Sequence, residues 1–383
     1  MGAVAGVNGA SGEVGRRSRL HTPTWVLRHT RTVLSLLWYC FSPAHRDIAL
    51  VSRTHEANRA DGSFDRLIPE AHGPRRLRKS GLLAVAREGA MASMITERQG
   101  SGKAALSIDV EDWFHAANLN VARESWERCE LRVERNTMRM MEILEASNAR
   151  ATFFVLGWVA EKCPQLVRAI AAAGHEVASH GYAHELVYSL KPGEFRSDVL
   201  RSKQYLEDLT GKPVRGYRAP SFSITEWAIP ILQDVGFDYD SSVVPTIAHH
   251  RYGRLNGMDA GRPVVLLRDG FYEVCISCIR LGKRGIPWGG GGYFRLVPYL
   301  MWLWGMRGIL RSGTPYIFYI HPWEIDAGQP RVTGIKATRR FRHRVNLQRC
   351  EERFAALAGA YKWIPLCDLI DGWNAGRPAP RLQ

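Results

Sequence analysis

The chain predicts an α/β protein in which helices cover a parallel sheet that is either open or closed into a barrel. Two observations predict this class. From residue 104 onward short apolar strands alternate with amphipathic helices about six or seven times, and polar residues follow the strands directly. The 383 residues, 45% of them apolar, are enough to bury a full-sized core. In folds of this kind the chemistry gathers at the carboxyl ends of the strands.

The first elements lie between residues 104 and 174. Ala104 to Ile108 is a short apolar strand, and apolar residues from Val133 to Leu144 recur at helical spacing. Residues 151–156 form a buried strand. Pro164 stands where the first turn of a helix tolerates it, and Gly174 ends that helix. The remaining expected elements are, in order, a strand at 175–178, a helix at 195–209, a strand at 214–217, a helix at 227–235, a strand beginning at 237–239, a strand at 316–320, a helix at 344–358 and a strand at 363–366.

Residues 1–100 differ from the rest of the chain. They are rich in Gly, Ser and Arg, show little periodicity, and carry 15 Lys and Arg against 8 Asp and Glu. We therefore expect a basic, poorly ordered leader at 1–100, followed by one compact domain at 101–383. A start of translation at Met91 or Met94 would account for the leader.

The net charge of +15 raises the question of nucleic acid or an anionic surface as a partner. Much of the excess lies in the leader and the chain has no recognised nucleic-acid motif, so we expect no nucleic-acid partner. No apolar run is long enough to span a bilayer, and the seven cysteines form no regular framework. These features favour a cytoplasmic protein with reduced thiols. Its oligomeric state does not follow from the sequence.

Two histidines four residues apart are the most informative single feature. His180 and His184 follow an apolar strand, and on one helical turn both imidazoles would point the same way. That geometry suits one metal ion, and catalytic zinc sites often join such a pair to a carboxylate and an open position. The plainer alternative is a pair of surface or helix-capping histidines. Further polar groups follow the other strands, at Asp109, Glu111, Asp112, Arg218, Asp240, Ser241 and His321.

Taken together, these strand ends resemble the five motifs of the NodB-type polysaccharide deacetylases, carbohydrate esterase family 4. The resemblance spans about residues 104–370 and implies a distorted (β/α) barrel. Such enzymes use a divalent metal, usually zinc, to remove N-acetyl groups from sugars. In family order the matching segments are Ser107-Ile108-Asp109, His180 to His184, Arg218-Ala219-Pro220, Asp240-Ser241-Ser242 and Tyr319-Ile320-His321.

Three further segments resemble one subgroup of that family. They are Asp-Val-Glu-Asp-Trp at 109–113, the glycine-rich run at 289–296 and His-Pro-Trp-Glu at 321–324. The subgroup accompanies exopolysaccharide gene clusters of exosortase-bearing bacteria.

The resemblance also implies a role for most of these residues. Asp109 aligns with the catalytic base, and His180 and His184 align with metal ligands. Arg218 would orient Asp109 and keep it ionised, and His321 would be the general acid. Asp240 and Ser241 echo the motif that lines the acetyl pocket, although the usual tryptophan of that motif is missing.

The metal's carboxylate ligand is left open between Glu111 and Asp112. Strand alternation favours Glu111, because residues two apart share a face with Asp109. Residue type favours Asp112, because the family ligand is an aspartate. Each group also has a plainer structural reading: the acids could cap a helix, Arg218 could lie on the surface, His321 could be a core histidine and Asp240-Ser241-Ser242 could form a turn.

Trp288 and Trp323 lie beside Gly or Pro loops, and we expect them to stack on sugar rings. The sequence therefore predicts zinc-dependent, or other metal-dependent, removal of N-acetyl groups from an amino sugar of a bacterial exopolysaccharide or its precursor. One alternative keeps the chemistry but changes the substrate to peptidoglycan, chitin oligosaccharide or another small amide. A second alternative, of another class, is a non-catalytic carbohydrate- or nucleic-acid-binding protein.

Overall fold

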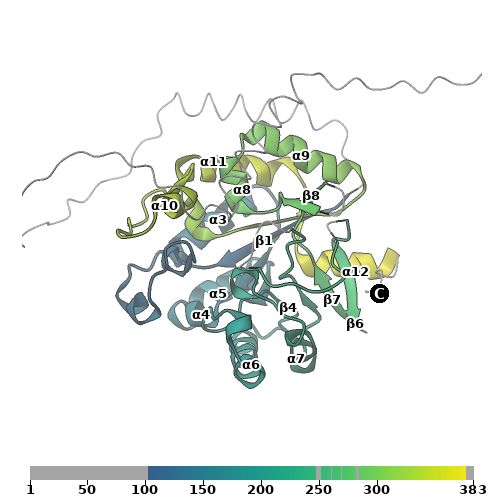
Figure 1. Ribbon diagram of the computed structural model, residues 1–383, viewed down its shortest axis with the longest axis horizontal. Helices are drawn as coiled ribbons and strands as arrows, with labels where there is room; N and C mark the ends of the chain where they lie inside the picture. The colour runs from purple at the N-terminus through teal and green to yellow at the C-terminus, as the bar shows by residue number, and fades with distance from the viewer. Residues whose placement is uncertain (1–101, 247–251, 260, 269, 282–283, 377–383) are drawn as a thin grey trace, which may run out of the picture. The chain divides into compact units, whose positions relative to one another are not determined.

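A parallel sheet forms the centre of the fold (Figure 1). The computed structural model describes residues 102–376, apart from 247–251, 260, 269 and 282–283. The prediction of a poorly ordered leader at 1–100 lies outside the described residues. The strands are β1 (Ala104–Val110), β2 (Thr152–Val155), β3 (Glu176–Ser179), β4 (Gly216–Tyr217), β5 (Tyr239–Asp240), β6 (Val264–Arg268), β7 (Phe271–Val274), β8 (Cys278–Leu281), β9 (Arg284–Pro287), β10 (Tyr316–Ile320) and β11 (Trp363–Ile364).

The main sheet runs in the order β10-β1-β2-β3-β4-β5-β7-β6, and β11 pairs with the beginning of β1. All neighbours in this order are parallel except β6, which pairs antiparallel with β7. β8 and β9 form a separate antiparallel pair. The described strands do not close into a ring, so the sheet is a curled half-barrel. The predicted α/β fold is confirmed, and of the two forms left open the sheet takes the open one.

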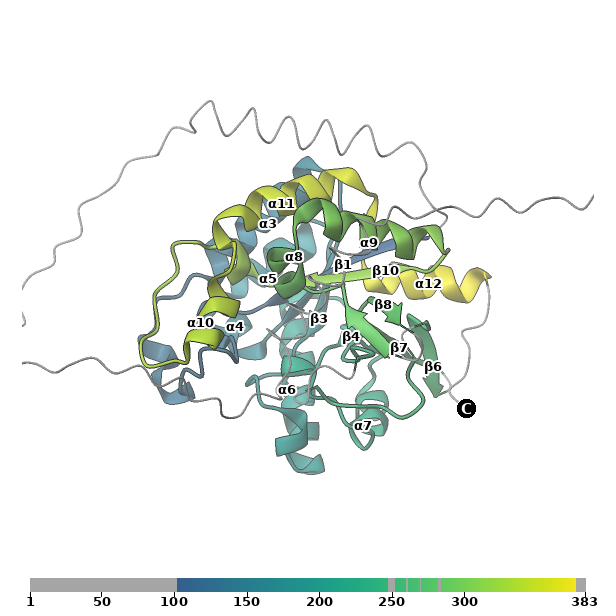
Figure 2. The same ribbon diagram turned by 45° about the horizontal axis from the view of Figure 1, so that its top comes forward.

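Helices cover the sheet, with α9 and α11 on one side and α6 and α7 on the opposite side (Figures 1 and 2). Pro164 stands at the first position of α5, as expected, and Gly211 and Gly236 end α6 and α7 with φ of 64° and 90°. The helices are α3 (Val133–Ala146), α4 (Gly157–Lys162), α5 (Pro164–Ala172), α6 (Pro192–Thr210), α7 (Ala228–Val235), α8 (Gly291–Leu296), α9 (Tyr299–Arg311), α10 (Ala337–Arg344), α11 (Leu347–Ala360) and α12 (Leu366–Gly376).

Two boundaries near the C-terminus differ from the sequence prediction. The helix expected at 344–358 begins at Leu347 as α11, because the preceding Asn346 adopts a left-handed φ of 52° that no continuous α-helix accepts. Arg344 ends a separate helix, α10, which the sequence pattern did not predict. The strand expected at 363–366 ends at Ile364, and Leu366 already begins α12. Five short 3₁₀ turns complete the described elements: η1 (Trp113–His115), η2 (Arg123–Arg128), η3 (Val187–Ser189), η4 (Pro220–Phe222) and η5 (Pro322–Ile325).

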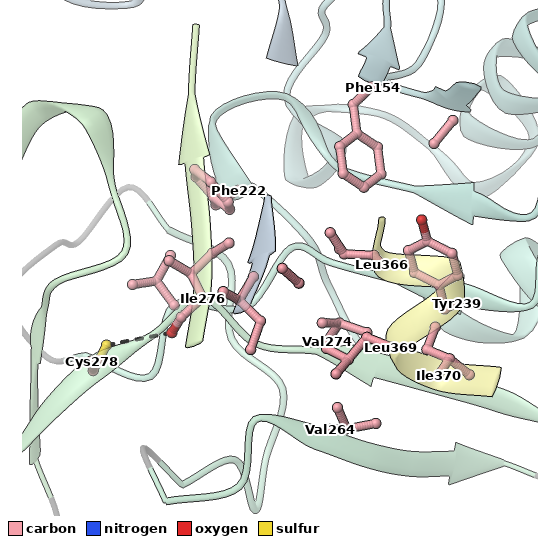
Figure 3. Close-up of a cluster of buried hydrophobic side chains, with 14 residues drawn as sticks. Phe154, Phe222, Tyr239, Val264, Val274, Ile276, Cys278, Leu366, Leu369 and Ile370 are labelled. Carbon is pink, nitrogen blue, oxygen red and sulfur yellow. Dashed lines mark hydrogen bonds between the residues drawn. The ribbon is translucent and has the colours of Figure 1, made fainter. Parts of the chain in front are cut away.

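The core beneath the strand ends is apolar and drawn from distant segments (Figure 3). Phe154 of β2, Tyr239 of β5 and Val274 of β7 meet Leu366 and Ile370 of α12. All five side chains are fully or almost fully buried. Burying a side chain of this size contributes roughly 1.5–3 kcal/mol, so this layer fixes the strands and, through them, the loops at their carboxyl ends.

Candidate functional site

Three metal-ligating side chains meet at the carboxyl ends of β1 and β3. Glu111, His180 and His184 each offer an atom within 4.8 Å of the others. The Nε2 atoms of His180 and His184 lie 2.9 and 3.0 Å from the same oxygen of Glu111. Glu111 is buried, and burial by itself would raise its pKa. The neighbouring histidines His184, His321 and His180 outweigh burial and hold the pKa well below its usual value.

The hydrogen bonds of His180 indicate that a proton or a cation belongs between His180 and Glu111. Its Nδ1 lies 2.8 Å from the backbone oxygen of Arg218, which can only accept, so Nδ1 carries the hydrogen. In the neutral ring, Nε2 then presents a lone pair to the carboxylate of Glu111. Two acceptors at 2.9 Å repel each other unless a proton or a cation lies between them. The donor set, two imidazoles and a carboxylate, therefore fits a divalent metal such as zinc.

The two histidines lie on a loop, which corrects the expectation of one helical turn. Gly181 and His184 have φ of 73° and 57°, and neither value belongs to a right-handed helix. The Asp198 carboxylate accepts from the backbone N–H groups of Tyr182 and Ala183 and so fixes the loop from α6. A Cβ on Gly181 would lie 3.0 Å from that carboxylate, so both the positive φ and the limited space favour glycine at this position.

Asp109 and Arg218 form a buried ion pair beside the histidines. Nη1 of Arg218 donates to Oδ1 of Asp109 at 2.6 Å and to the Ser107 hydroxyl at 2.8 Å. Its Nε and Nη2 donate to the backbone oxygen and the hydroxyl of Ser241. The guanidinium also lies over the Phe154 ring at 4.1 Å. Arg218 is fully buried, and each of its side-chain nitrogens donates a hydrogen bond. Since Arg218 bonds Oδ1 of Asp109, Oδ2 is the free oxygen of that carboxylate.

His321 faces that free oxygen from the end of β10. Its Nε2 lies 3.9 Å from Oδ2 of Asp109 and 3.9 Å from Glu111. Its Nδ1 bonds Glu324 at 2.8 Å. Burial would lower the pKa of His321, but the charges of Glu111, Glu324 and Asp109 raise it to about 9. A histidine that is charged at neutral pH and faces Asp109 and Glu111 is well suited to donate a proton.

Sequence reasoning missed the partners of His321. Glu324 accepts from His321 with one oxygen and from Nε of Arg295 with the other, at 2.6 Å. Burial would raise the pKa of Glu324, but Arg295 and His321 lower it to about 2. A Cβ on Gly291 would lie 2.1 Å from this carboxylate. The run His-Pro-Trp-Glu and the glycine-rich run at 289–296 were the available signals, because they contain Glu324 and Arg295.

Asp112, the other candidate ligand, lies away from the metal-ligating group. Its oxygens accept the backbone N–H groups of Trp113, Arg132 and Val133 at 2.6–2.8 Å. Burial raises the pKa of this carboxyl. The structure thus brings Glu111 to the histidines and uses Asp112 to join η1 to the start of α3.

Asp240 and Ser241 lie behind the ion pair. Asp240 accepts from the Ser242 hydroxyl, which in turn accepts the backbone N–H of Ala219 at 2.7 Å. Burial raises the pKa of Asp240 to about 6, and burial together with the charge of Asp240 raises the pKa of Glu273 well above its usual value. Asp240 acts through Ser242, and the Ser241 hydroxyl accepts from Arg218 directly. Asp240 and Ser241 therefore support the loop that carries Arg218, away from the histidines.

The two tryptophans predicted to bind sugar are both buried. Trp288 donates to the backbone oxygen of Trp302 at 2.9 Å and accepts from the indole of Trp302 at 3.1 Å, which fixes it against α9. Trp323 is stacked between His321 and His343, with ring centroids 5.2 and 4.6 Å apart. Because Trp323 is buried and stacks on the His321 ring, it supports His321.

Comparison with known proteins agrees with this geometry. Residues 126–239 match the family model described as polysaccharide deacetylase, and residues 241–371 match a domain of unknown function, DUF3473. The first range contains His180, His184 and Arg218, and the second contains Arg295, His321 and Glu324. The candidate site therefore draws on both matched ranges and on β1, which precedes them.

Relatives with assigned names are similar over part of their length. A peptidoglycan deacetylase of Helicobacter pylori is 32% identical over 106 residues, which are 28% of this chain and 36% of that protein. A peptidoglycan-N-acetylglucosamine deacetylase of Bacillus cereus is 28% identical over 120 residues, 27% of this chain and 44% of that protein. The chain thus spans less than half of either relative.

A solved structure shares the fold. The crystal structure of a putative polysaccharide deacetylase from Mycobacterium smegmatis superposes with a TM-score of 0.52 at 22% identity, covering 75% of this chain and 95% of that one. Within the described residues, no helix is both long and apolar enough to cross a bilayer. Part of this chain is thus similar to polysaccharide deacetylases, both in the family model that residues 126–239 match and in the named relatives.

Proposed function

We propose that the protein is a metal-dependent deacetylase that hydrolyses the N-acetyl group of an amino sugar in a bacterial exopolysaccharide or its precursor. The observation that carries the proposal is the meeting of Glu111, His180 and His184 with the Asp109–Arg218 pair on one side and His321 on another. These six residues lie at or after the ends of β1, β3, β4 and β10, which are distant in the sequence.

Glu111, His180 and His184 would hold the metal. A divalent ion such as zinc, when bound, lowers the pKa of a bound water and polarises an amide carbonyl. The backbone oxygen of Arg218 keeps the hydrogen of His180 on Nδ1, so that Nε2 stays available as a ligand atom.

Asp109 would take the proton of the attacking water. Arg218 occupies one oxygen of Asp109 and leaves the other facing His321. Because Arg218 is buried and tied to Ser107 and Ser241, it holds Asp109 in one orientation.

His321 would protonate the departing amine. Its Nδ1 is engaged by Glu324, so the proton available to substrate is the one on Nε2, which faces Asp109. General acid–base steps of this kind typically contribute about 10²–10⁴-fold to the rate.

The test combines metal analysis with release of acetate from a panel of N-acetylated glycans. We expect the purified protein to contain stoichiometric zinc, or to be activated by an added divalent metal, and Asp109→Asn to lose activity by about 10²–10⁴-fold. Asp208→Asn, on the exposed face of α6, is the matched control and should retain activity. A folded protein that releases no acetate with any metal or substrate would refute the proposal and favour a carbohydrate-binding role.

The nearer alternative keeps this chemistry on a different substrate. The similarity to proteins named peptidoglycan deacetylase and to a chitooligosaccharide deacetylase of Bradyrhizobium favours peptidoglycan or chitin oligosaccharide. Only the order of rates across the substrate panel separates these from an exopolysaccharide.

A further inference from the structure

A cavity lined by arginines lies beyond His321. It has a volume of about 430 Å³ and is lined by Ala327, Arg331, Arg344, Asn346, Leu347, Gln348 and Arg349. From residue 327 to 349 the chain carries seven Lys and Arg and no Asp or Glu. All charged side chains of the segment that supplies the cavity lining are therefore positive.

The positive charge of the cavity is not balanced by nearby carboxylates. Among the described residues, none forms an ion pair with Arg331, Arg344 or Arg349. Asp326 is close but already engaged, because Arg132 and Arg135 contact it at 3.1 and 3.0 Å. Burial and the charge of Arg331 lower the pKa of Arg344, and the opposing charge of Asp326 does not outweigh them.

The backbone orients Arg344 across the cavity. Its nitrogens approach the backbone oxygens of Gln329 and Ala327, at 3.4 and 3.3 Å. Asn346 to Arg349, at the start of α11, also line the cavity, and no side chain caps that helix. The first turn of a 14-residue helix adds a weak positive potential to that of the arginines.

The cavity is joined to the candidate site through three stacked rings. Trp323 stacks on His321 and on His343, the residue before Arg344. His343 in turn bonds Gln329 at 2.7 Å, within the loop that carries Ala327 and Arg331. In Figures 1 and 2, α10 lies on the same side of the molecule as α4, which begins at the carboxyl end of β2.

We propose that this cavity binds an anionic group, a carboxylate or a phosphate, carried by the glycan whose N-acetyl group is hydrolysed next to His321. The inference rests on the proposed function and narrows it to an acidic glycan. Arginine suits such a group because its planar fork can bind two oxygens at once.

Binding by the zinc-supplemented full chain tests the proposal, with Asp109→Asn as background so that no substrate is consumed. The probes are a tetrasaccharide that alternates N-acetylglucosamine with glucuronate and a neutral chitin tetrasaccharide, compared by calorimetry. We expect the acidic probe to bind at least about 10-fold more tightly. Arg344→Gln or Arg331→Gln should each remove about 10-fold of that preference, the effect of one charge-assisted hydrogen bond.

Arg339→Gln is the matched control, because Arg339 is exposed on α10 and does not line the cavity. Arg331 is also exposed and forms no ion pair within the described residues, so its variant should fold even if Arg344→Gln does not. Equal affinity for the two probes, or an equal loss in Arg339→Gln, would overturn the proposal. Competition by inorganic phosphate at constant ionic strength would identify the preferred group as phosphate, and its absence would identify carboxylate.

Failure here is distinguishable from failure of the proposed function. The binding preference is measured without turnover, whereas the deacetylase proposal depends on acetate release by the wild-type protein. A protein that prefers the acidic probe but releases no acetate would support the arginine site and refute the deacetylase proposal.

Discussion

Glu111 and Glu324 are both buried glutamates bonded to histidine, yet their surroundings differ. Glu111 faces two histidine nitrogens at 2.9 and 3.0 Å and no arginine, so a proton or a cation is needed between it and these nitrogens. Glu324 lies between His321 and Arg295, and the fixed charge of Arg295 already balances it. The comparison indicates that one glutamate is arranged to bind a cation and the other to hold a histidine in place.

Removal of the Glu111 charge should have the larger effect. We expect Glu111→Gln to lose the bound metal and to reduce acetate release by more than about 10²-fold, because a ligand and its charge are removed together. Metal content by elemental analysis and acetate release measure the two effects. Retention of zinc at wild-type affinity would show that Glu111 is no ligand.

Removal of the Glu324 charge should leave the metal in place. We expect Glu324→Gln to bind zinc normally but to lower kcat about 10–100-fold, because His321 loses the partner that orients it and raises its pKa. Metal affinity and kcat measured on the same preparation check this. Parallel loss of both would mean that the two glutamates act as one unit.

The pKa of His321 sharpens the comparison, because it depends on both glutamates. Without metal we expect it near 9, as the neighbouring carboxylates favour the charged ring. Zinc should lower this pKa by offsetting Glu111, and Glu324→Gln should lower it independently. The titration of the imidazole, followed by NMR with and without zinc, measures both shifts. An unchanged pKa of His321 in Glu324→Gln would argue against a direct electrostatic interaction between Glu324 and His321.

The same shift has a consequence for stability in the metal-free protein. A histidine whose folded pKa lies above its unfolded value of about 6.5 stabilises the fold fully below that pH. The stabilisation is lost as the pH rises towards about 9. The difference in free energy of unfolding between wild type and His321→Gln should therefore shrink across this interval. A constant difference would contradict the assigned shift.

Asp112 should behave differently from both glutamates. Its carboxylate bonds three backbone N–H groups, so Asp112→Ala should lower the free energy of unfolding by about 2–4 kcal/mol. Because Asp112 lies away from the histidines, the folded fraction should still bind zinc. Denaturant unfolding and metal titration separate these effects. Loss of zinc binding in protein that remains folded would restore Asp112 as a candidate ligand.

The sequence placed the strand ends well, because apolar strands followed by polar residues are a local signal. Strand alternation from Asp109 favoured Glu111, and the structure brings that residue to the histidines. The helical turn expected for His180 and His184 was wrong because the left-handed φ of His184 leaves no local signal in a non-glycine residue.

Other features depend on contacts that no local pattern encodes. Arg295 and Glu324 are separated by 29 positions, and only the folded chain brings them to 2.6 Å. Trp288 beside four glycines looked like a sugar platform, but its indole bonds the backbone of α9 instead. The β8–β9 pair and the antiparallel β6 were not predicted, and they lie where the chain leaves the strand–helix alternation.

The glycines at 289–292 look like a phosphate-binding loop, but their surroundings assign them another task. A side chain at Gly289 or Gly290 would collide with β10, and one at Gly291 would collide with the Glu324 carboxylate, whereas Gly292 has open space around it. Glycine at 291 thus leaves room for the Glu324 carboxylate to reach His321. A methyl group at this position would displace Glu324 and so misalign the proposed proton donor without contacting it.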